Sequence, residues 1–208
     1  MLRWVGRVVL AALVLFVVLW TILPGDTPGL LPEAFVPERE TPEETVRTVV
    51  ASEALIDGIR KTAAKEVIWA REDRARTPLS LVYVHGFSAS KAELRPVPDR
   101  AAERLGATLF FTRLTGHGRD GAAMGTARAE DWMRDMAEAV AVGKALGERV
   151  VLMGTSMGGA LTALAASQLE DDPAMAGYVM VSPAFGLQGA GTSLLTLPFA
   201  RVWVPWVV

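Results

Sequence analysis

The chain has 208 residues, of which 51% are hydrophobic, and its formal net charge is −2. This length fits one domain with a sizeable core plus an appendage. The charge is balanced, so the sequence lacks the excess of basic residues that is typical of proteins that bind nucleic acid. The absence of cysteine excludes disulfides, thiolate metal sites and a cysteine nucleophile. Only two histidines are present, His85 and His117, so the choice of a catalytic base within this chain is narrow.

Residues 1–23 have the pattern of a membrane anchor. Arg3 and Arg7 precede an apolar run that extends from Val8 to Leu23. Counted from Trp4, about 20 residues would form a helix of roughly 30 Å, which is enough to cross a bilayer. A tryptophan lies near each end of the segment, where membrane interfaces favour aromatic side chains.

A cleaved signal peptide and a buried core helix are the alternatives for this segment. A signal peptide has a shorter apolar run that ends in a small-x-small site, whereas this run ends in Leu23-Pro24-Gly25-Asp26. We therefore expect an uncleaved single-pass anchor. Its basic flank would stay in the cytoplasm and place the rest of the chain on the periplasmic or extracytoplasmic side.

A proline-rich segment, residues 24–41, comes next, with a proline every four or five residues. Such a segment cannot form a helix or a central strand, so it is predicted to be a semi-rigid tether. The core domain is predicted over residues 42–183. It begins with the capping box Thr41-Pro42-Glu43-Glu44, which indicates a helix that ends before Gly58.

Strands and helices alternate through the rest of the domain. Short apolar runs between turn residues predict strands over 65–70, 79–84, 108–112, 150–153 and 177–181. Helices are expected over 92–105, 130–146 and 160–169, and a glycine-rich loop over 113–129. This alternation predicts an α/β fold with right-handed crossovers and a doubly wound parallel sheet covered on both faces.

The strand at 150–153 runs into a Gly-x-Ser-x-Gly sequence that is typical of a nucleophile elbow. Ser156 would sit at the apex of a sharp turn, with Gly154 and Gly158 where strand and helix pass too close for a Cβ. The N–H of Met157 would begin the helix and face developing negative charge, as an oxyanion donor does. A glycine-rich turn without chemistry is the alternative, but the strand and helix on either side favour the elbow.

Three motifs follow three successive strands: His85-Gly86-Phe87, then Arg113-Leu114-Thr115-Gly116-His117-Gly118, then Gly154-Thr155-Ser156-Met157-Gly158-Gly159. Together they resemble the α/β-hydrolases, and most closely the branch of esterases, monoacylglycerol lipases and serine aminopeptidase-like enzymes.

The resemblance covers about residues 65–183 and implies Ser156 as nucleophile, with the backbone N–H groups of Phe87 and Met157 as oxyanion hole. It further implies that His85, Gly86 and His117 shape the site without supplying the base, and that no metal or organic cofactor is needed.

The sequence departs from this family after the elbow. The family's triad runs in the order Ser, Asp or Glu, then His. No histidine follows Ser156, and the next carboxylates, Glu170, Asp171 and Asp172, lie at the wrong end of the elbow helix. We therefore expect a C-terminally incomplete fold, in which residues 184–208 are the start of a cap or a truncated tail.

Three functions fit these patterns. The first is a membrane-anchored serine hydrolase of carboxylic esters, including lipid-like acyl esters, whose acid and base lie outside this sequence, so that the chain itself is inactive. The second is a complete enzyme with His117 as base, oriented by Asp120 or Asp131. The third is a non-catalytic, membrane-tethered binding module of hydrolase fold. The expected partners are a small-molecule ester and the membrane, without nucleic acid.

Overall fold

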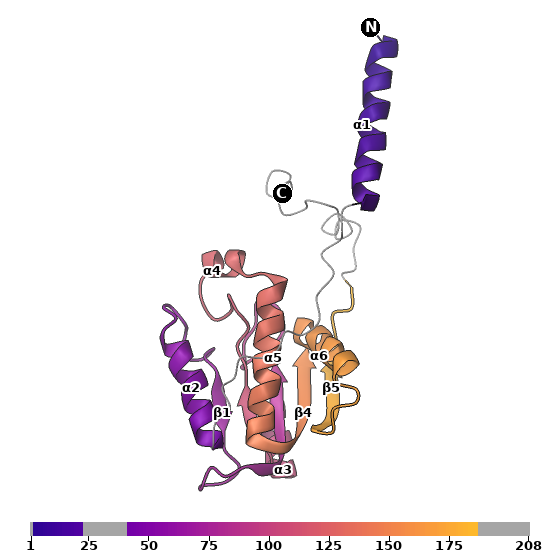
Figure 1. The fold of residues 1–208 in the computed structure, drawn as a ribbon. Helices are drawn as coiled ribbons and strands as arrows, with labels where there is room; N and C mark the ends of the chain where they lie inside the picture. The colour runs from indigo at the N-terminus through magenta and orange to yellow at the C-terminus, as the bar shows by residue number, and fades with distance from the viewer. Residues whose placement is uncertain (1, 23–40, 187–208) are drawn as a thin grey trace. The chain divides into compact units, whose positions relative to one another are not determined.

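The computed structural model describes residues 2–22 and 41–186 (Figure 1). Contacts divide the chain into two compact units, one formed by Met1–Thr27 with Gly186–Val208 and the other by Pro28–Phe185. Each unit is described by itself. The predicted tether at 24–41 and the predicted tail at 184–208 lie almost entirely outside the described residues.

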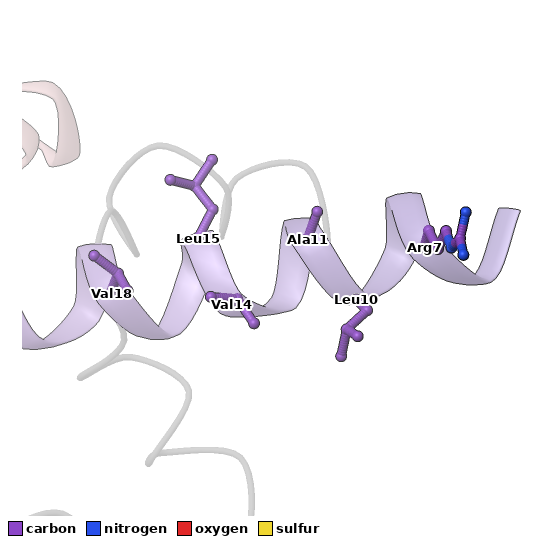
Figure 2. Close-up of a pocket in the computed structure, with 6 residues that line it drawn as sticks. All are labelled: Arg7, Leu10, Ala11, Val14, Leu15 and Val18. Carbon is purple, nitrogen blue, oxygen red and sulfur yellow. The ribbon is translucent and has the colours of Figure 1, made fainter. Parts of the chain in front are cut away.

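The first unit contains α1 (Leu2–Ile22), so the apolar N-terminal segment is helical. Its side chains from Trp4 to Val18 are all exposed. Several of them line an apolar hollow along the helix (Figure 2): Arg7, Leu10, Ala11, Val14, Leu15 and Val18. Within the described ranges, no helix combines the length and hydrophobicity required to cross a membrane.

The second unit begins with α2 (Pro42–Ala54), which starts where the capping box predicts. The Thr41 side chain accepts a hydrogen bond of 3.3 Å from the N–H of Glu44, and Pro42 occupies the first helical position. Both features favour a helix start, because the first N–H groups of a helix lack partners within it. Val49 of this helix is buried in the core.

The centre of this unit is a five-stranded sheet with the strand order β1-β3-β2-β4-β5. Its strands are β1 (Glu66–Ile68), β2 (Thr77–Val84), β3 (Thr108–Phe111), β4 (Gly147–Thr155) and β5 (Met175–Val181). The last four pair in parallel, with Val82 opposite both Phe110 and Leu152. Because β2, β3 and β4 are parallel neighbours, the loops that follow them all lie at one edge of the sheet.

The prediction of an all-parallel sheet is wrong for β1, which pairs antiparallel with β3. Only residues 69–76 join β1 to β2. A parallel connection needs a crossover of about a dozen residues or more, usually with a helix. The segment is too short for that crossover, so the chain reverses direction and the sheet is mixed.

Four further helices are α3 (Val97–Leu105), α4 (Gly121–Thr126), α5 (Ala129–Leu146) and α6 (Met157–Gln168). α3 begins later than predicted, just after Pro96, because a proline disfavours helical backbone at the residue before it. α4 was not predicted; its first turn is capped by Asp120, which accepts a 2.9 Å hydrogen bond from the Ala123 N–H. α6 begins at Met157, directly after Ser156.

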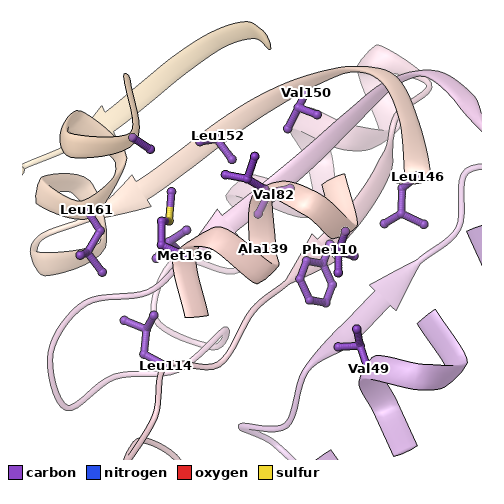
Figure 3. Close-up of a cluster of buried hydrophobic side chains, with 14 of the residues drawn as sticks. Val49, Val82, Phe110, Leu114, Met136, Ala139, Leu146, Val150, Leu152 and Leu161 are labelled. Atoms are coloured by element: carbon purple, nitrogen blue, oxygen red, sulfur yellow. The ribbon is translucent and has the colours of Figure 1, made fainter. Parts of the chain in front are cut away.

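Alternate residues of the central strands contribute their side chains to two hydrophobic cores, one on each face of the sheet. Val82 and Leu152 belong to the larger core, which α5 and α6 complete with side chains such as Met136 and Leu161 (Figure 3). Neighbouring strand residues, such as Tyr83, belong to a second cluster with α3. Both faces of β2 and β4 are therefore buried, which explains why these strands are continuous apolar runs.

Candidate active site

Ser156 occupies the turn between β4 and α6 with φ 52° and ψ −117°. A serine rarely adopts a positive φ, and such strain persists only where the surroundings enforce it. The Ser156 N–H donates to the Val181 carbonyl at 3.0 Å, and the Ser156 carbonyl accepts from the Ala160 and Ala184 N–H groups at 3.0 and 2.9 Å. The end of β5 thus holds the turn from one side and α6 from the other.

The two elbow glycines lie where the backbone leaves no room for a side chain. A Cβ at Gly154 would lie 2.2 Å from the Gly158 carbonyl oxygen, and a Cβ at Gly158 would lie 2.1 Å from the Val84 carbonyl oxygen. These are backbone atoms that cannot swing aside. The close approach of α6 to β4 and β2 therefore requires glycine at both positions.

The His85-Gly86-Phe87 segment leaves the end of β2 and packs directly on the elbow. A Cβ built on Gly86 would lie 3.1 Å from the Ser156 Cβ. Among the described residues, the Phe87 N–H has no hydrogen-bond acceptor. The Met157 N–H opens α6 and so lacks an acceptor within the helix. The structure thus brings both predicted oxyanion donors to neighbouring strand ends, and their catalytic role stays a prediction.

His85 is fully buried, and both of its ring nitrogens are engaged. Nδ1 lies 2.8 Å from the Gly86 carbonyl oxygen, and Nε2 accepts from the Leu114 N–H at 3.2 Å. Burial, with His117 and Arg113 nearby, lowers the pKa of His85 to about 4. The imidazole is therefore neutral at pH 7, carries its proton on Nδ1, and joins the loops that follow β2 and β3.

His117 is also buried and has a similar arrangement. Nδ1 lies 3.2 Å from the Thr115 carbonyl oxygen, and Nε2 accepts from the Ser88 N–H at 3.0 Å. Burial lowers the pKa of His117. Because the Ser88 amide already uses the basic nitrogen, that nitrogen is not free to accept a proton from a serine.

The two acids that the sequence offers as partners of His117, Asp120 and Asp131, are engaged elsewhere. Asp120 caps α4, and Asp131 accepts a 2.9 Å hydrogen bond from the Arg128 N–H at the start of α5. Asp172, beyond the end of α6, pairs with Lys144 at 2.5 Å, which lowers the pKa of that carboxyl. In the described part of the chain, no three His, Cys, Asp or Glu side chains gather to hold a metal ion.

An aromatic cluster lies beside the predicted oxyanion loop. The ring of Phe87 meets the rings of His117 and Trp132 edge-on, with centroid distances of 5.8 and 6.2 Å. The rings of His85 and His117 lie 4.8 Å apart. The Phe87 side chain is still 58% exposed, so an apolar surface adjoins the backbone N–H proposed for catalysis.

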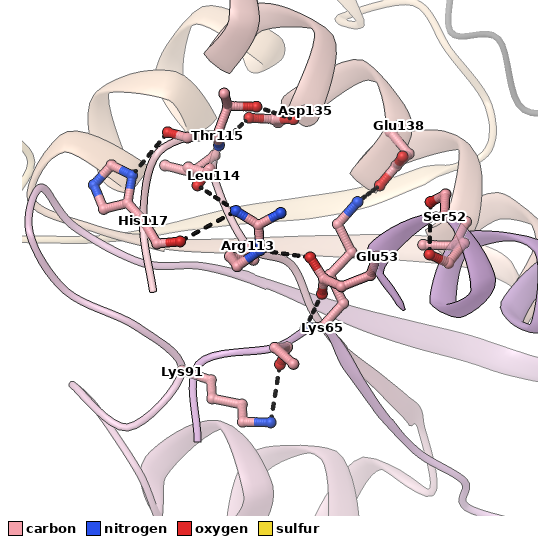
Figure 4. A network of polar contacts seen from close by, with 12 residues as sticks. Ser52, Glu53, Lys65, Lys91, Arg113, Leu114, Thr115, His117, Asp135 and Glu138 are labelled. Carbon is pink, nitrogen blue, oxygen red and sulfur yellow. Dashed lines mark hydrogen bonds and ion pairs between the residues drawn. The ribbon is translucent and has the colours of Figure 1, made fainter. Parts of the chain in front are cut away.

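Polar contacts that the sequence did not reveal hold the loop after β3 (Figure 4). Arg113 forms a buried ion pair of 2.5 Å with Glu53 of α2 and donates to the His117 carbonyl at 3.1 Å. Asp135 of α5 accepts from the Thr115 N–H at 2.5 Å and from the Thr115 hydroxyl at 3.1 Å. The only indication of these contacts in the sequence was a charged residue within the apolar periodicity of a helix. The exposed face of a helix carries charged residues as well, so this indication was not specific.

A mostly parallel sheet whose central strand turns through a strained serine into a helix is a fold of the α/β-hydrolase type. Comparison with protein families matches residues 76–207 to the family described as "Serine aminopeptidase, S33". The match covers more than half of the chain, so the chain belongs to this family of α/β-hydrolase enzymes.

Two relatives illustrate the similarity. A thermostable monoacylglycerol lipase from Bacillus sp. (strain H-257) is 31% identical over 107 residues, which are 51% of this chain and 41% of that protein. A solved structure from a study of LipS and LipT, two metagenome-derived lipolytic enzymes, is 28% identical with a TM-score of 0.55. That match covers 66% of this chain and 52% of the other. The chain thus spans about half the length of these relatives.

Proposed function

We propose that this chain supplies the nucleophile and the oxyanion hole of a serine hydrolase that acts on carboxylic esters. The observation that carries the proposal is the strained Ser156 turn, held between β4 and α6 beside two backbone N–H groups. The Ser156 hydroxyl oxygen would attack the ester carbonyl carbon. The N–H groups of Phe87 and Met157 would then stabilise the negative charge that develops on the carbonyl oxygen.

The same proposal assigns the base to residues other than His85 and His117. Support comes from their ring nitrogens, which are engaged with backbone groups in the loops after β2 and β3. A serine hydroxyl is a weak nucleophile until a neighbouring base removes its proton. The 208-residue chain is therefore expected to turn over esters very slowly by itself.

For the substrate we propose an ester of a lipid-like acyl group. The relatives named above are a monoacylglycerol lipase and lipolytic enzymes. In this chain, Phe87 and Trp132 offer an apolar aromatic surface beside the predicted oxyanion donor. An alkyl chain next to the scissile carbonyl could be desolvated on that surface, which would favour acyl esters over charged ones.

The test is hydrolysis of a short p-nitrophenyl ester by the chain and by its Ser156→Ala and His117→Ala variants. Loss of the histidine of a serine hydrolase lowers turnover by about a million-fold, so all three proteins should stay near the buffer rate. Any form of the protein that does hydrolyse the ester should lose this activity in Ser156→Ala. Robust turnover by the 208-residue chain that disappears in both variants would instead identify His117 as the base.

We further propose that residues 1–23 anchor the protein, with the domain on the extracytoplasmic side. The support is the sequence pattern alone, an apolar run from Val8 to Leu23 with a flank of Arg3 and Arg7, because the described part of α1 does not reach the length and hydrophobicity of a membrane span. Full-length protein should stay in the membrane fraction during carbonate extraction. Release by carbonate, or a mature N-terminus beyond Leu23, would contradict the anchor.

A further inference from the structure

A polar trio, Glu93, Tyr83 and Thr155, links the two loops that carry the proposed oxyanion donors. Glu93 lies in the turn before α3, and its Oε2 accepts from the Gly86 N–H at 2.8 Å. The same oxygen lies 3.0 Å from the Tyr83 hydroxyl at the end of β2. The Tyr83 hydroxyl is in turn hydrogen-bonded to the Thr155 hydroxyl at 3.0 Å.

The donor at each step follows from the chemistry of the groups. An ionised carboxylate can only accept, so Glu93 accepts hydrogen bonds from both the Gly86 N–H and the Tyr83 hydroxyl. The Tyr83 oxygen is then free to accept from Thr155. Burial raises the pKa of Tyr83, and the adjacent Glu93 adds to this effect. The phenol therefore stays protonated and donates a hydrogen bond to Glu93.

Each end of the trio is attached next to a proposed oxyanion donor. Gly86 directly precedes Phe87, and Thr155 directly precedes the Ser156-Met157 turn. A Cβ built on Gly86 would lie 2.7 Å from the Glu93 Oε1 and 3.1 Å from the Ser156 Cβ. Gly86 is therefore enclosed between the carboxylate and the elbow, and a shift of the carboxylate would move the Gly86-Phe87 peptide relative to Ser156.

We infer that Glu93 is a positioning residue, which fixes the separation between the Phe87 and Met157 N–H groups by holding Gly86 and, through Tyr83, Thr155. The inference rests on the proposed function, because it assigns Glu93 a role in oxyanion stabilisation. That stabilisation requires donors about 2.7–3.1 Å from the position of the oxyanion. Without Glu93, the Gly86 N–H would donate its hydrogen bond to water instead. The distance between the loop after β2 and the elbow would then no longer be fixed.

Glu93 itself is exposed, so its contribution to global stability should be small. This separates a positioning role from a merely structural one. Glu93→Ala should lower kcat for an ester about 10- to 100-fold, since misplacement of a catalytic group by about 1 Å can cost that much. KM should change less than about two-fold, and Tm should shift by no more than about 2 °C.

The kinetic test uses the form of the gene product that shows Ser156-dependent ester hydrolysis. Glu93→Gln keeps one acceptor oxygen and should recover part of the kcat lost in Glu93→Ala. Tyr83→Phe should add little to Glu93→Ala, because both act through the same contact. Glu103→Ala is the matched control, since Glu103 is an exposed glutamate of α3 whose side chain makes no hydrogen bond or ion pair among the described residues. It should leave kcat unchanged.

A second measurement is independent of activity. In the 208-residue chain, the Gly86 amide should be protected from hydrogen exchange, and Glu93→Ala should remove this protection while Glu103→Ala should not. Unchanged Gly86 protection in Glu93→Ala would overturn the inferred contact. Lost protection with unchanged kcat would overturn the positioning role. If no form of the protein hydrolyses the ester in a Ser156-dependent way, the proposed hydrolase function fails instead, and the exchange result in the 208-residue chain still decides the contact.

Discussion

Single buried residues of this protein differ in how they respond to acid. Both ring nitrogens of His85 are hydrogen-bonded to backbone groups, and the carboxylate of Asp135 accepts hydrogen bonds from Thr115. Burial disfavours the charged form of each, so it lowers the pKa of the histidine and raises that of the aspartate. The two groups therefore contribute to the pH dependence of stability with opposite signs.

His85 should make the fold less stable in acid. Its folded pKa of about 4 lies below the ordinary histidine pKa of 6.5, so the unfolded chain binds more protons between these values. The free energy of unfolding should fall as the pH drops from about 6.5 to about 4, by about 3 kcal/mol from this group. A ring-proton NMR titration is simple here, because the chain has only two histidines. A His85 titration near pH 6.5 would contradict the assignment.

Asp135 should act in the opposite direction. Its folded pKa of about 6 exceeds the ordinary aspartate pKa of 3.8, so the folded chain binds more protons between these values. The free energy of unfolding should rise as the pH drops from about 6 to about 4, by up to about 3 kcal/mol from this group.

The two contributions oppose each other over nearly the same pH range, so the parent protein should show a flat profile there. Asp135→Asn removes one of them, and urea unfolding of this variant should reveal a clear loss of stability on acidification. A pH profile of Asp135→Asn that matches the profile of the parent would show that the carboxylate does not titrate in this range.

At the scale of an element, the contact of α6 with β2 and β4 depends on glycines. A methyl group at Gly158 would meet the backbone oxygen atoms of Val84 and His85 at 2.1 and 2.5 Å. Gly158→Ala should therefore move α6, lower stability by several kcal/mol, and abolish any Ser156-dependent activity.

The matched control for this change is Gly125→Ala in α4. A Cβ at Gly125 meets nothing within 4 Å, so alanine there should leave stability unchanged or raise it by about 0.5–1 kcal/mol. Thermal unfolding of both variants is sufficient to compare them. Equal stability of Gly158→Ala and the parent protein would mean that the elbow is not packed as described.

At the scale of the whole domain, a buried ion pair joins α2 to the loop after β3. The side chains of Glu53 and Arg113 are only 7% and 4% exposed, and the main-chain N–H of Lys65 also donates to Glu53. Glu53→Gln would leave the Arg113 guanidinium buried without a counter-charge. The expected loss of stability is about 3–5 kcal/mol, as for other buried pairs that lose one partner.

An exposed pair provides the comparison. Glu43 and Arg74 are 47% and 51% exposed, so Glu43→Gln should cost no more than about 1 kcal/mol. Guanidinium-induced unfolding of the two variants measures the difference. A similar small loss in both would show that the Glu53–Arg113 pair is hydrated rather than buried.

The sequence by itself determined the elements that depend on local patterns. Apolar runs between turns marked the strands, the Thr41 capping box marked the start of α2, and the Gly-x-Ser-x-Gly sequence marked the elbow. Spacing and turn chemistry act within a few residues, which is why such patterns are readable along the chain. The family likewise followed from three short motifs in order, and the family comparison agrees with it.

Only the tertiary structure decided how distant residues meet. It showed the antiparallel pairing of β1, the engagement of both histidines by backbone groups, and the contacts of Glu93, Asp135 and Arg113. A glutamate in a turn or an aspartate on a helix looks the same in sequence whether it faces solvent or holds a loop. Its role is set by what the fold places opposite it, since a hydrogen bond depends on separation in space and not along the chain.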